Sequence, residues 1–299
     1  MIKNLTFIFF TSAVLSPSLL AITVVPKTIY VEDNRNEIYS SPAVIQELSP
    51  SIAAQVSNDY LSLEKDNFKI TASTLGKAHC STVRFADQIA GARCSGFLVA
   101  PNVVATAGHC MISQNECDGY KWIFDYKLKN GNDKSYQLAQ KSNVFSCKKI
   151  LAQKLEYIGG LDYALIQLDR NVEGRTPIVV DFENETIVGT PLYVLGFPSG
   201  IPMKYTDSST IFEDSPKVFK SHLDIFAGNS GSAVFSAETN KVVGIVSMGT
   251  GDWTWNDAKT CKVEKICREG DKCEPNVMSK MNFIKNEFNL AIQAAKTEE

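Results

Sequence analysis

The stretch GNSGS at 228–232, together with the two apolar segments that follow it, is the part of the sequence that decides the fold class. The apolar segments cover residues 232–235 and 242–248, and the polar run 238–241 between them is typical of a hairpin turn. Glycines on both sides of Ser230 allow a sharp backbone turn before the first strand. We therefore expect a β-hairpin that begins with a tight Gly/Ser loop.

The same texture of short apolar runs, broken by Gly, Pro, Asn and Asp, covers most of the chain. Further runs lie at 96–100, 103–106, 121–126, 163–168 and 192–197. Many short strands with frequent turns predict an all-β barrel or sandwich. The end of the chain differs, because its apolar residues recur at every third or fourth position from Val277 to Ile292. That spacing predicts a C-terminal α-helix over about 277–296.

Charge and composition exclude several classes of protein. The 299 residues include 30 basic and 33 acidic side chains, for a net charge of −3. A polybasic nucleic-acid binder is excluded, because no positive excess exists to neutralise phosphates. A hydrophobic content of 44% excludes a long disordered chain. We expect no nucleic-acid partner and no cofactor.

The first 21 residues have the pattern of a secretory signal peptide, with Lys3 before a largely apolar run. Cleavage is expected after Ala21 or Ser18. The alternative is an uncleaved membrane anchor, although the apolar run is shorter than the ~20 residues that span a bilayer. We expect a secreted or periplasmic protein with no membrane contact after signal removal.

Residues 22–75 differ from the rest of the chain, because they contain no glycine and no cysteine. We expect an N-terminal extension here, before a main domain at 76–299. A propeptide, an arm that packs on the domain and a linker are all compatible with this composition.

Eight cysteines, an even number, follow the signal segment. In an oxidising compartment they predict four disulfides. A zinc site is the alternative, because Cys261, Cys267 and Cys273 recur every six residues. Zinc ligands usually stand closer together along the chain, so we expect no metal.

Only three histidines are present, at positions 79, 109 and 222. His109 stands in TAGHC at 106–110, where an apolar strand ends in small residues. A bridge from Cys94 to Cys110 would pin this turn, and a general base must be held within reach of its nucleophile. Taken alone, a loop histidine beside a structural disulfide explains the pattern equally well.

Two further residues carry chemistry of the same kind. Asp162 follows two glycines at the start of an apolar strand, where a partly buried carboxylate needs a partner such as an imidazole N–H. A strand-capping aspartate is the alternative. Around Ser230, the N–H groups of Gly228 and Ser230 can converge into a nest that holds an oxyanion. A plain Gly/Ser turn between strands is the alternative.

The order His, Asp, Ser along the chain separates this pattern from the α/β-hydrolases (Ser, Asp, His) and the subtilisins (Asp, His, Ser). From about Cys80 to the end, the chain resembles the chymotrypsin/trypsin-like serine proteases. The resemblance rests on segments 106–110, 162–165, 228–232 and 244–249. The Gly-Asn-Ser-Gly form is closer to the bacterial members, including those similar to glutamyl endopeptidases, than to animal trypsins.

The resemblance implies a fold and an activity. The fold would be two six-stranded antiparallel β-barrels with a C-terminal helix, and the triad would be His109, Asp162 and Ser230. The protein would be a secreted, monomeric serine endopeptidase that hydrolyses protein or peptide substrates through an acyl-enzyme. Ser247 and Gly249 would hydrogen-bond the substrate backbone as an added strand.

The residue that selects the substrate is less directly indicated. Asp224 lies six residues before Ser230, where trypsins carry the acid that binds Arg or Lys, and this suggests cleavage after basic residues. A structural carboxylate is the alternative. Asn276 stands where trypsins need a glycine for pocket room, and Val246 stands where acid-specific relatives carry a histidine.

Two other features depart from the animal enzymes. Asn229 replaces the Asp that pairs with a newly cut N-terminus, so activation by that ion pair is not expected. We expect Cys117 and Cys147 to pair across the loop after His109, and the last three cysteines to staple a local insertion. A catalytically silent, protease-like binding protein and a secreted esterase are the rival functions.

Overall fold

The computed structural model describes residues 29–133, 136–157, 160–249, 251–268, 271 and 273–297. The expected signal peptide, residues 1–21, lies outside these ranges. Among the described residues, none of the helices has both the length and the apolar character needed to cross a bilayer.

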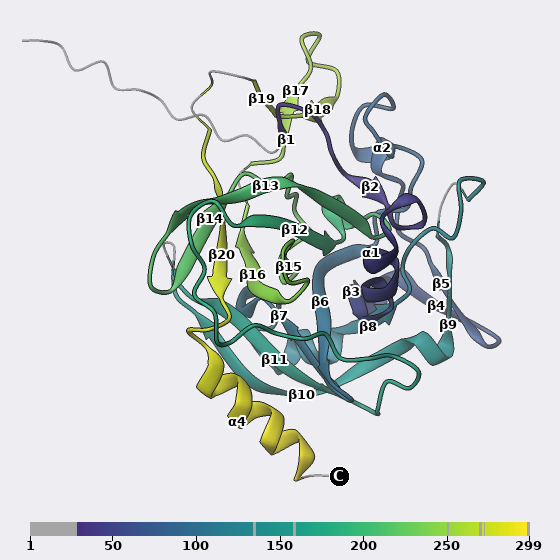
Figure 1. Cartoon of the computed structure of the whole chain (residues 1–299). Helices are drawn as coiled ribbons and strands as arrows, with labels where there is room; N and C mark the ends of the chain where they lie inside the picture. The colour runs from purple at the N-terminus through teal and green to yellow at the C-terminus, as the bar shows by residue number, and fades with distance from the viewer. Residues whose placement is uncertain are drawn as a thin grey trace, which may run out of the picture.

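The first half of the chain closes a six-stranded antiparallel barrel (Figure 1). Its strands, in their order around the barrel, are β10 (Val144–Leu155), β11 (Asp162–Leu168), β7 (Val103–Thr106), β6 (Ala92–Ala100), β3 (Ile52–Ser57) and β8 (Tyr120–Phe124). β10 pairs with both β11 and β8, so the sheet has no free edge.

The second half forms another ring of six antiparallel strands. These are β12 (Pro191–Gly196), β15 (Ala233–Ser236), β16 (Val242–Met248), β20 (Asn276–Lys280), β14 (Val218–Ser221) and β13 (Lys204–Asp214). Pairing of β12 with β13 closes the ring, and β2 (Asn36–Glu37) adds to β13 from outside. The hairpin expected from residues 232–248 is β15–β16.

Neighbouring strand residues alternate between two packing environments. On β11, Ala164 and Ile166 face the interior of the first barrel, whereas Tyr163 and Leu165 join a core shared with the second barrel. On β12, Val194 lies in a core of second-barrel residues and its neighbours join the shared core. This alternation follows from the two-residue period of a strand, and it fixes the two barrels against each other.

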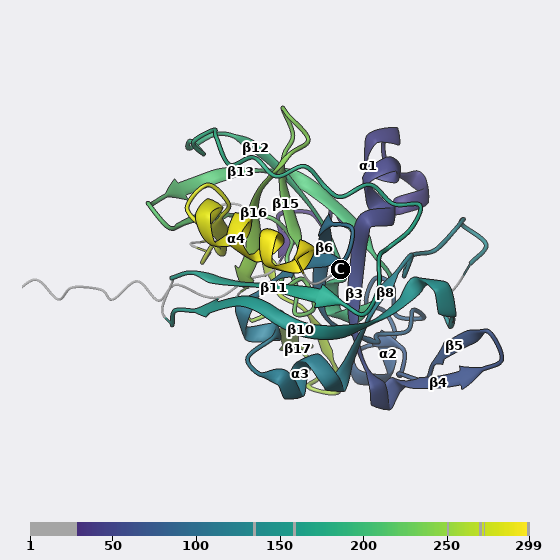
Figure 2. The same ribbon diagram turned by 90° about the horizontal axis from the view of Figure 1, so that it is seen from below.

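The C-terminal helix α4 spans Lys285–Lys296 and lies against β10 and β11 (Figure 2). Its buried residues Phe288, Ala291 and Ala295 join the shared core. The expected start at 277 was wrong, because residues 276–280 form the buried strand β20, bonded on both sides to β14 and β16. The fold otherwise confirms the expected pair of six-stranded barrels with a C-terminal helix.

The segment 22–75 contributes directly to the first barrel. β3, at Ile52–Ser57, pairs with β6 on one side and with β8 on the other. The barrel therefore begins at residue 52 rather than at the expected boundary of 76. Residues 29–37 also pair with later parts of the chain, through β1 (Ile29–Tyr30) and β2.

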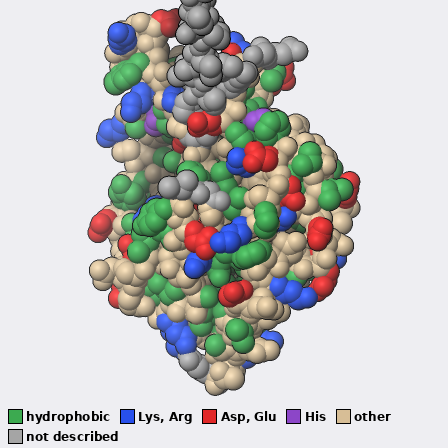
Figure 3. Space-filling model, turned by 90° about the vertical axis from the view of Figure 1, so that its left-hand side faces the viewer, with side chains coloured by type: hydrophobic (Ala, Val, Ile, Leu, Met, Phe, Trp, Pro, Cys, Tyr) green, Lys and Arg blue, Asp and Glu red, His purple; other side chains and the backbone are tan. Residues whose placement is uncertain are grey.

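The remaining elements are short. They are β4 (Leu61–Glu64), β5 (Asn67–Ile70), β9 (Leu138–Gln140), β17 (Trp253–Trp255), β18 (Lys262–Glu264), β19 (Ile266–Cys267), α1 (Ala43–Leu48), α2 (Leu75–Ala78) and α3 (Gln114–Gly119). Single 3₁₀ turns lie at Ile38–Ser40, Ser49–Ser51, Asn58–Tyr60, Gly108–Cys110, Lys141–Asn143 and Pro198–Gly200. On the face in Figure 3, acidic and basic side chains are interspersed rather than gathered by sign, as the near-neutral net charge leads one to expect.

Four disulfides join all eight cysteines. The expected Cys94–Cys110 and Cys117–Cys147 bridges are both present. Cys267 pairs locally with Cys273, but Cys261 pairs with the distant Cys80. The zinc alternative fails, because every sulfur that could have served as a thiolate ligand is bonded to another sulfur.

Candidate active site

His109 and Asp162 are joined by two hydrogen bonds. His109 lies in the 3₁₀ turn after β7, and Asp162 is the first residue of the neighbouring strand β11. The ring Nδ1 lies 2.6 Å from Asp162 Oδ2, and the backbone N–H of His109 donates to Oδ1 at 2.9 Å. A buried carboxylate in this position fixes the ring and directs its proton to Nδ1, which leaves Nε2 available as a base.

A serine of the second barrel holds the backbone of Asp162. The N–H of Asp162 donates to Ser279 Oγ at 2.9 Å, and this Oγ also lies 3.2 Å from the Asp162 carbonyl. Ser247 Oγ lies 2.7 Å from Ser279 Oγ and extends the chain of hydroxyls. Sequence reasoning missed Ser279, because a lone serine within a buried strand gives no signal.

The loop before Ser230 presents two backbone N–H groups. Gly228 has φ +97°, and the Ala227 carbonyl accepts a 2.6 Å bond from Ser199 N–H. Because the peptide is trans, the Gly228 N–H points the opposite way, away from Ser199. Within the described chain, neither this N–H nor that of Ser230 donates a hydrogen bond. The expected pair of oxyanion donors is therefore available.

Ser95 of the first barrel supports this loop, and the sequence did not indicate it. Its N–H donates to the Ser230 carbonyl at 2.8 Å, and its Oγ donates to the Gly228 carbonyl at 2.7 Å. Gly231 has φ +84° and packs so closely on Ser95 and Thr106 that a Cβ would collide with both. The glycine after Ser230 is thus required by conformation and by space.

His109, Asp162 and Ser230 all line one cavity of about 530 Å³. Its other walls come mainly from the second barrel, including Ile225, Val246, Ser247, Met248, Gly249 and Val277. The structure thus brings together the three expected triad residues and both expected substrate-strand residues. The cavity lies where the two barrels meet, since β11 and β16 both contribute to it.

Asp224 is not part of this cavity, although the sequence suggested a substrate-binding role. It is 1% exposed, and its two carboxylate oxygens accept backbone N–H groups of Tyr30 and Asn34 at 2.8 and 3.1 Å. Asn276 is also buried, and its Nδ2 donates to the Leu223 carbonyl at 2.7 Å. Burial raises the pKa of Asp224 to about 7.

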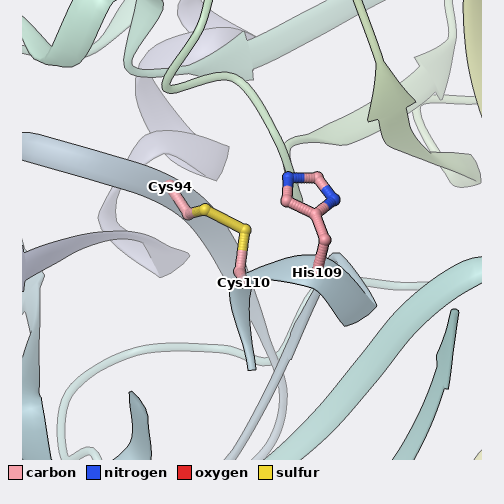
Figure 4. A group of neighbouring side chains, drawn as sticks. All are labelled: Cys94, His109 and Cys110. Carbon is pink, nitrogen blue, oxygen red and sulfur yellow. A yellow bond between two sulfur atoms is a disulfide. The ribbon is translucent and has the colours of Figure 1, made fainter. Parts of the chain in front are cut away.

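The disulfide between Cys94 and Cys110 lies beside His109, and Cys110 belongs to the same turn as His109 (Figure 4). Their sulfurs approach the His109 ring closely enough to resemble a metal-binding group. Because the two sulfurs are bonded to each other, they cannot act as thiolate ligands. The bridge instead ties the turn that carries His109 to strand β6.

The other two histidines lie elsewhere. His79 packs against the Trp253 ring at 3.7 Å, and its Nδ1 lies 3.1 Å from the Leu75 carbonyl. His222 lies between the rings of Tyr30 and Phe212, at 4.6 and 4.7 Å, where burial lowers its pKa. Neither lines the cavity that contains Ser230.

Comparison with known proteins agrees with this geometry. A family model described as a trypsin-like peptidase domain matches residues 94–245. No curated protein sequence matches.

Solved structures share the fold at low sequence identity. The Vibrio cholerae VesB protease is 16% identical, with a TM-score of 0.52 over 85% of this chain and 67% of that one. A Glu endopeptidase is 15% identical, with a TM-score of 0.52 over 90% and 99% of the two chains. Human heparin binding protein is 14% identical, with a TM-score of 0.51 over 81% and 91%. At these identities the likeness concerns the fold alone.

Proposed function

Because the chain belongs to the trypsin-like peptidase family, we propose that it is a serine endopeptidase with Ser230 as its nucleophile. The observation that carries the proposal is the pair of hydrogen bonds from His109 to Asp162, beside a cavity that Ser230 also lines. A nucleophile, a base and a group that orients the base are the three parts that covalent acyl transfer requires.

The proposed reaction has two halves. Ser230 Oγ attacks the carbonyl carbon of the scissile peptide while His109 Nε2 takes the hydroxyl proton. The oxyanion that forms accepts bonds from the N–H groups of Gly228 and Ser230. His109 then passes its proton to the leaving amine as the C–N bond breaks. Water hydrolyses the resulting ester on Ser230 by the same steps in reverse order.

Asp162 supports both halves without itself gaining a proton. Its carboxylate orients the His109 ring and stabilises the imidazolium that forms during each proton transfer. The substrate backbone would pair with β16 as an added strand, through Ser247 and Gly249.

For the residue before the cut, we propose an uncharged, apolar side chain. Expected cleavage after basic residues depended on Asp224, which lies outside the cavity. The cavity that Ser230 lines has the apolar side chains of Ile225, Val246 and Val277 in its walls. Two further carboxylates at the cavity already have partners: Asp252 accepts the Ala227 N–H at 2.6 Å, and Glu156 pairs with Lys217 at 2.9 Å.

The setting of the protein is part of the same proposal. Four disulfides and an N-terminal segment of signal-peptide composition support a secreted or periplasmic location. We propose that the enzyme acts there as a monomer on proteins or peptides. The rival is a silent binding protein on the same fold, and one structural neighbour is named for binding heparin. The complete His109–Asp162 pair and the free oxyanion donors favour the enzyme.

Labelling with a fluorophosphonate probe tests the proposal. The wild-type protein should be labelled and Ser230→Ala should not. Ser232→Ala should still be labelled, because the Ser232 side chain is buried against Asn229 and is not the proposed nucleophile. Absence of label on folded wild-type protein would favour the silent binding protein. Hydrolysis of esters without cleavage of any peptide in a library would favour the esterase, and a library cut mainly after Arg or Lys would retire the apolar preference.

A further inference from the structure

Residues 29–37, which we call the strap, contact the loop at residues 224–230 that carries Ser230. Asp224, at the start of that loop, accepts N–H groups of the strap with both carboxylate oxygens. The partners are 194 and 190 residues away along the chain. Because Asp224 is 1% exposed, water does not replace these bonds if they are lost.

A second contact joins the strap to the same loop. The Arg35 guanidinium lies 4.1 Å from the centre of the Phe226 ring, and Phe226 lines the active-site cavity. Arg35 is fully buried and is fixed by two bonds to Asp33, at 2.8 and 2.6 Å. The strap therefore holds the loop at residues 224 and 226, on both sides of the wall residue Ile225.

The strap is itself anchored at both ends. At one end β1 pairs with β19, and at the other β2 pairs with β13. Glu37 adds an ion pair to the buried Lys204 at 3.2 Å, and Arg84 donates to the Asp33 carbonyl at 2.8 Å. Because the strap is fixed at both ends, it can hold the 224–230 loop in one position.

The residue before Ser230 supplies no comparable constraint. Asn229 is buried and neutral, and its amide oxygen accepts only a 3.3 Å bond from Ser232 Oγ. A charged group in this place could be held by an ion pair, whereas an amide cannot. In the described structure, the charged side chains in contact with this loop are Asp252, which accepts the Ala227 N–H at 2.6 Å, and those that join Asp224 and Phe226 to the strap.

We propose that the strap positions the 224–230 loop so that Ser230 and the oxyanion donors face the substrate, with Asp224 and Arg35 as positioning residues. This inference rests on the proposed peptidase function and assigns Asp224 to loop support rather than to selection of basic side chains. Maturation that removes residues 1–28 would leave the strap in place. Maturation that cuts beyond residue 37 and removes the strap would inactivate the enzyme.

The test compares two buried aspartates in the full-length protein. In Asp224→Asn, the amide can accept from one of the two N–H groups but presents its own NH₂ to the other. The matched control is Asp181→Asn, because Asp181 Oδ1 also accepts two backbone N–H groups, at 3.2 and 3.1 Å, in a turn away from the cavity. Glu32→Ala, at an exposed strap residue, controls for changes in the strap itself.

Two measurements are made on each variant. The rate of fluorophosphonate labelling should fall at least tenfold in Asp224→Asn and less than twofold in both controls. Hydrogen exchange of peptides covering 225–230, measured in a Ser230→Ala background, should rise only in Asp224→Asn. If Asp224→Asn does not fold, Arg35→Lys replaces it, because lysine keeps the charge but loses the flat stacking on Phe226.

The outcomes separate this inference from the proposed function. Equal labelling and equal exchange in Asp224→Asn and wild type would overturn the inference, as would a rate loss no larger than in Asp181→Asn. Loss of a preference for Arg or Lys at unchanged kcat would also overturn it. If the wild type is not labelled at all, the peptidase function fails, and the exchange measurement alone decides whether the strap holds the loop.

Discussion

Asp162 receives two hydrogen bonds from the same residue, one from the His109 ring and one from the His109 backbone. The second bond fixes the turn as well as the ring, so the direction of the imidazole does not depend on side-chain packing alone. Ser279 Oγ bonds the Asp162 backbone from the other barrel, and it links this pair to the half of the molecule that carries Ser230.

Asp162→Asn should lower kcat by about four orders of magnitude while the protein stays folded. Because the backbone N–H of His109 can only donate, the asparagine oxygen would face it and the NH₂ group would face Nδ1, which favours the wrong tautomer of His109. Peptide hydrolysis and the thermal midpoint should be measured together. A variant that kept a tenth of the wild-type kcat would contradict the assigned role of Asp162.

Loss of the Cys94–Cys110 bridge should affect both stability and rate. The double alanine variant opens a loop with a sequence separation of 16 and should lose about 3 kcal/mol of unfolding free energy. The Cys117–Cys147 double variant should lose a comparable amount, because its separation is 30. Only the first should slow labelling of Ser230 beyond what its stability explains. Equal labelling rates in the two variants would show that the bridge does not position His109.

Gly231→Ala should abolish activity and destabilise the fold by more than its backbone angle explains. A Cβ there meets Ser95 and Thr106, in addition to the cost of roughly 1–2 kcal/mol for a positive φ. Gly174→Ala is the control, because Gly174 has φ +70° but open space around it. Urea unfolding measures both variants, and equal losses would mean that the collision is relieved by movement.

The stability of the wild type relative to Asp224→Asn should fall as the pH rises from about 4 to 7. Burial raises the pKa of Asp224 from 3.8 to about 7; Asp33 also raises it, while the Tyr30 and Asn34 N–H groups and Arg35 oppose the shift. In this pH range the folded state holds a proton that the unfolded state has released, so raising the pH disfavours folding. The slope is at most about 1.4 kcal/mol per pH unit.

Denaturant unfolding at several pH values measures this difference, with the same substitution at Asp181 as the comparison. Burial raises the pKa of Asp181, but the bonds from Asn184 and Glu183 together outweigh it and lower the pKa overall. Its contribution should therefore be present above pH 4 and should disappear as the pH falls below that value. Parallel curves for the two aspartates would contradict the prediction.

Gly249→Val should reduce cleavage after large apolar residues. A Cβ at Gly249 would lie 3.5 Å from Asn276 Oδ1 and 3.7 Å from Ile225, so the further methyl groups of valine would narrow the cavity. kcat/KM for bulky side chains should fall by more than tenfold, while that for Ala changes little. An unchanged preference would show that the side chain binds elsewhere.

The local motifs of the site could be predicted, and its long-range contacts could not. Each residue of the proposed triad lies in its own short motif, and the order His, Asp, Ser of the three motifs pointed to them together. β3 is a short buried strand whose partners begin at residues 92 and 120, and nothing within Ile52–Ser57 identifies them. The spacing of Asp224 from Ser230 suggested an acid in the substrate pocket. The strap residues that bond Asp224 lie 194 and 190 residues away along the chain, so the sequence around Asp224 gives no sign of them.

The Cys80–Cys261 bridge connects residues 181 positions apart and encloses most of both barrels. A single backbone cut anywhere between them would leave the two fragments covalently joined. Nicked and intact protein would therefore migrate together in electrophoresis until a reductant is added, when two fragments would separate. Self-cleavage between these two cysteines would be invisible without that reduction.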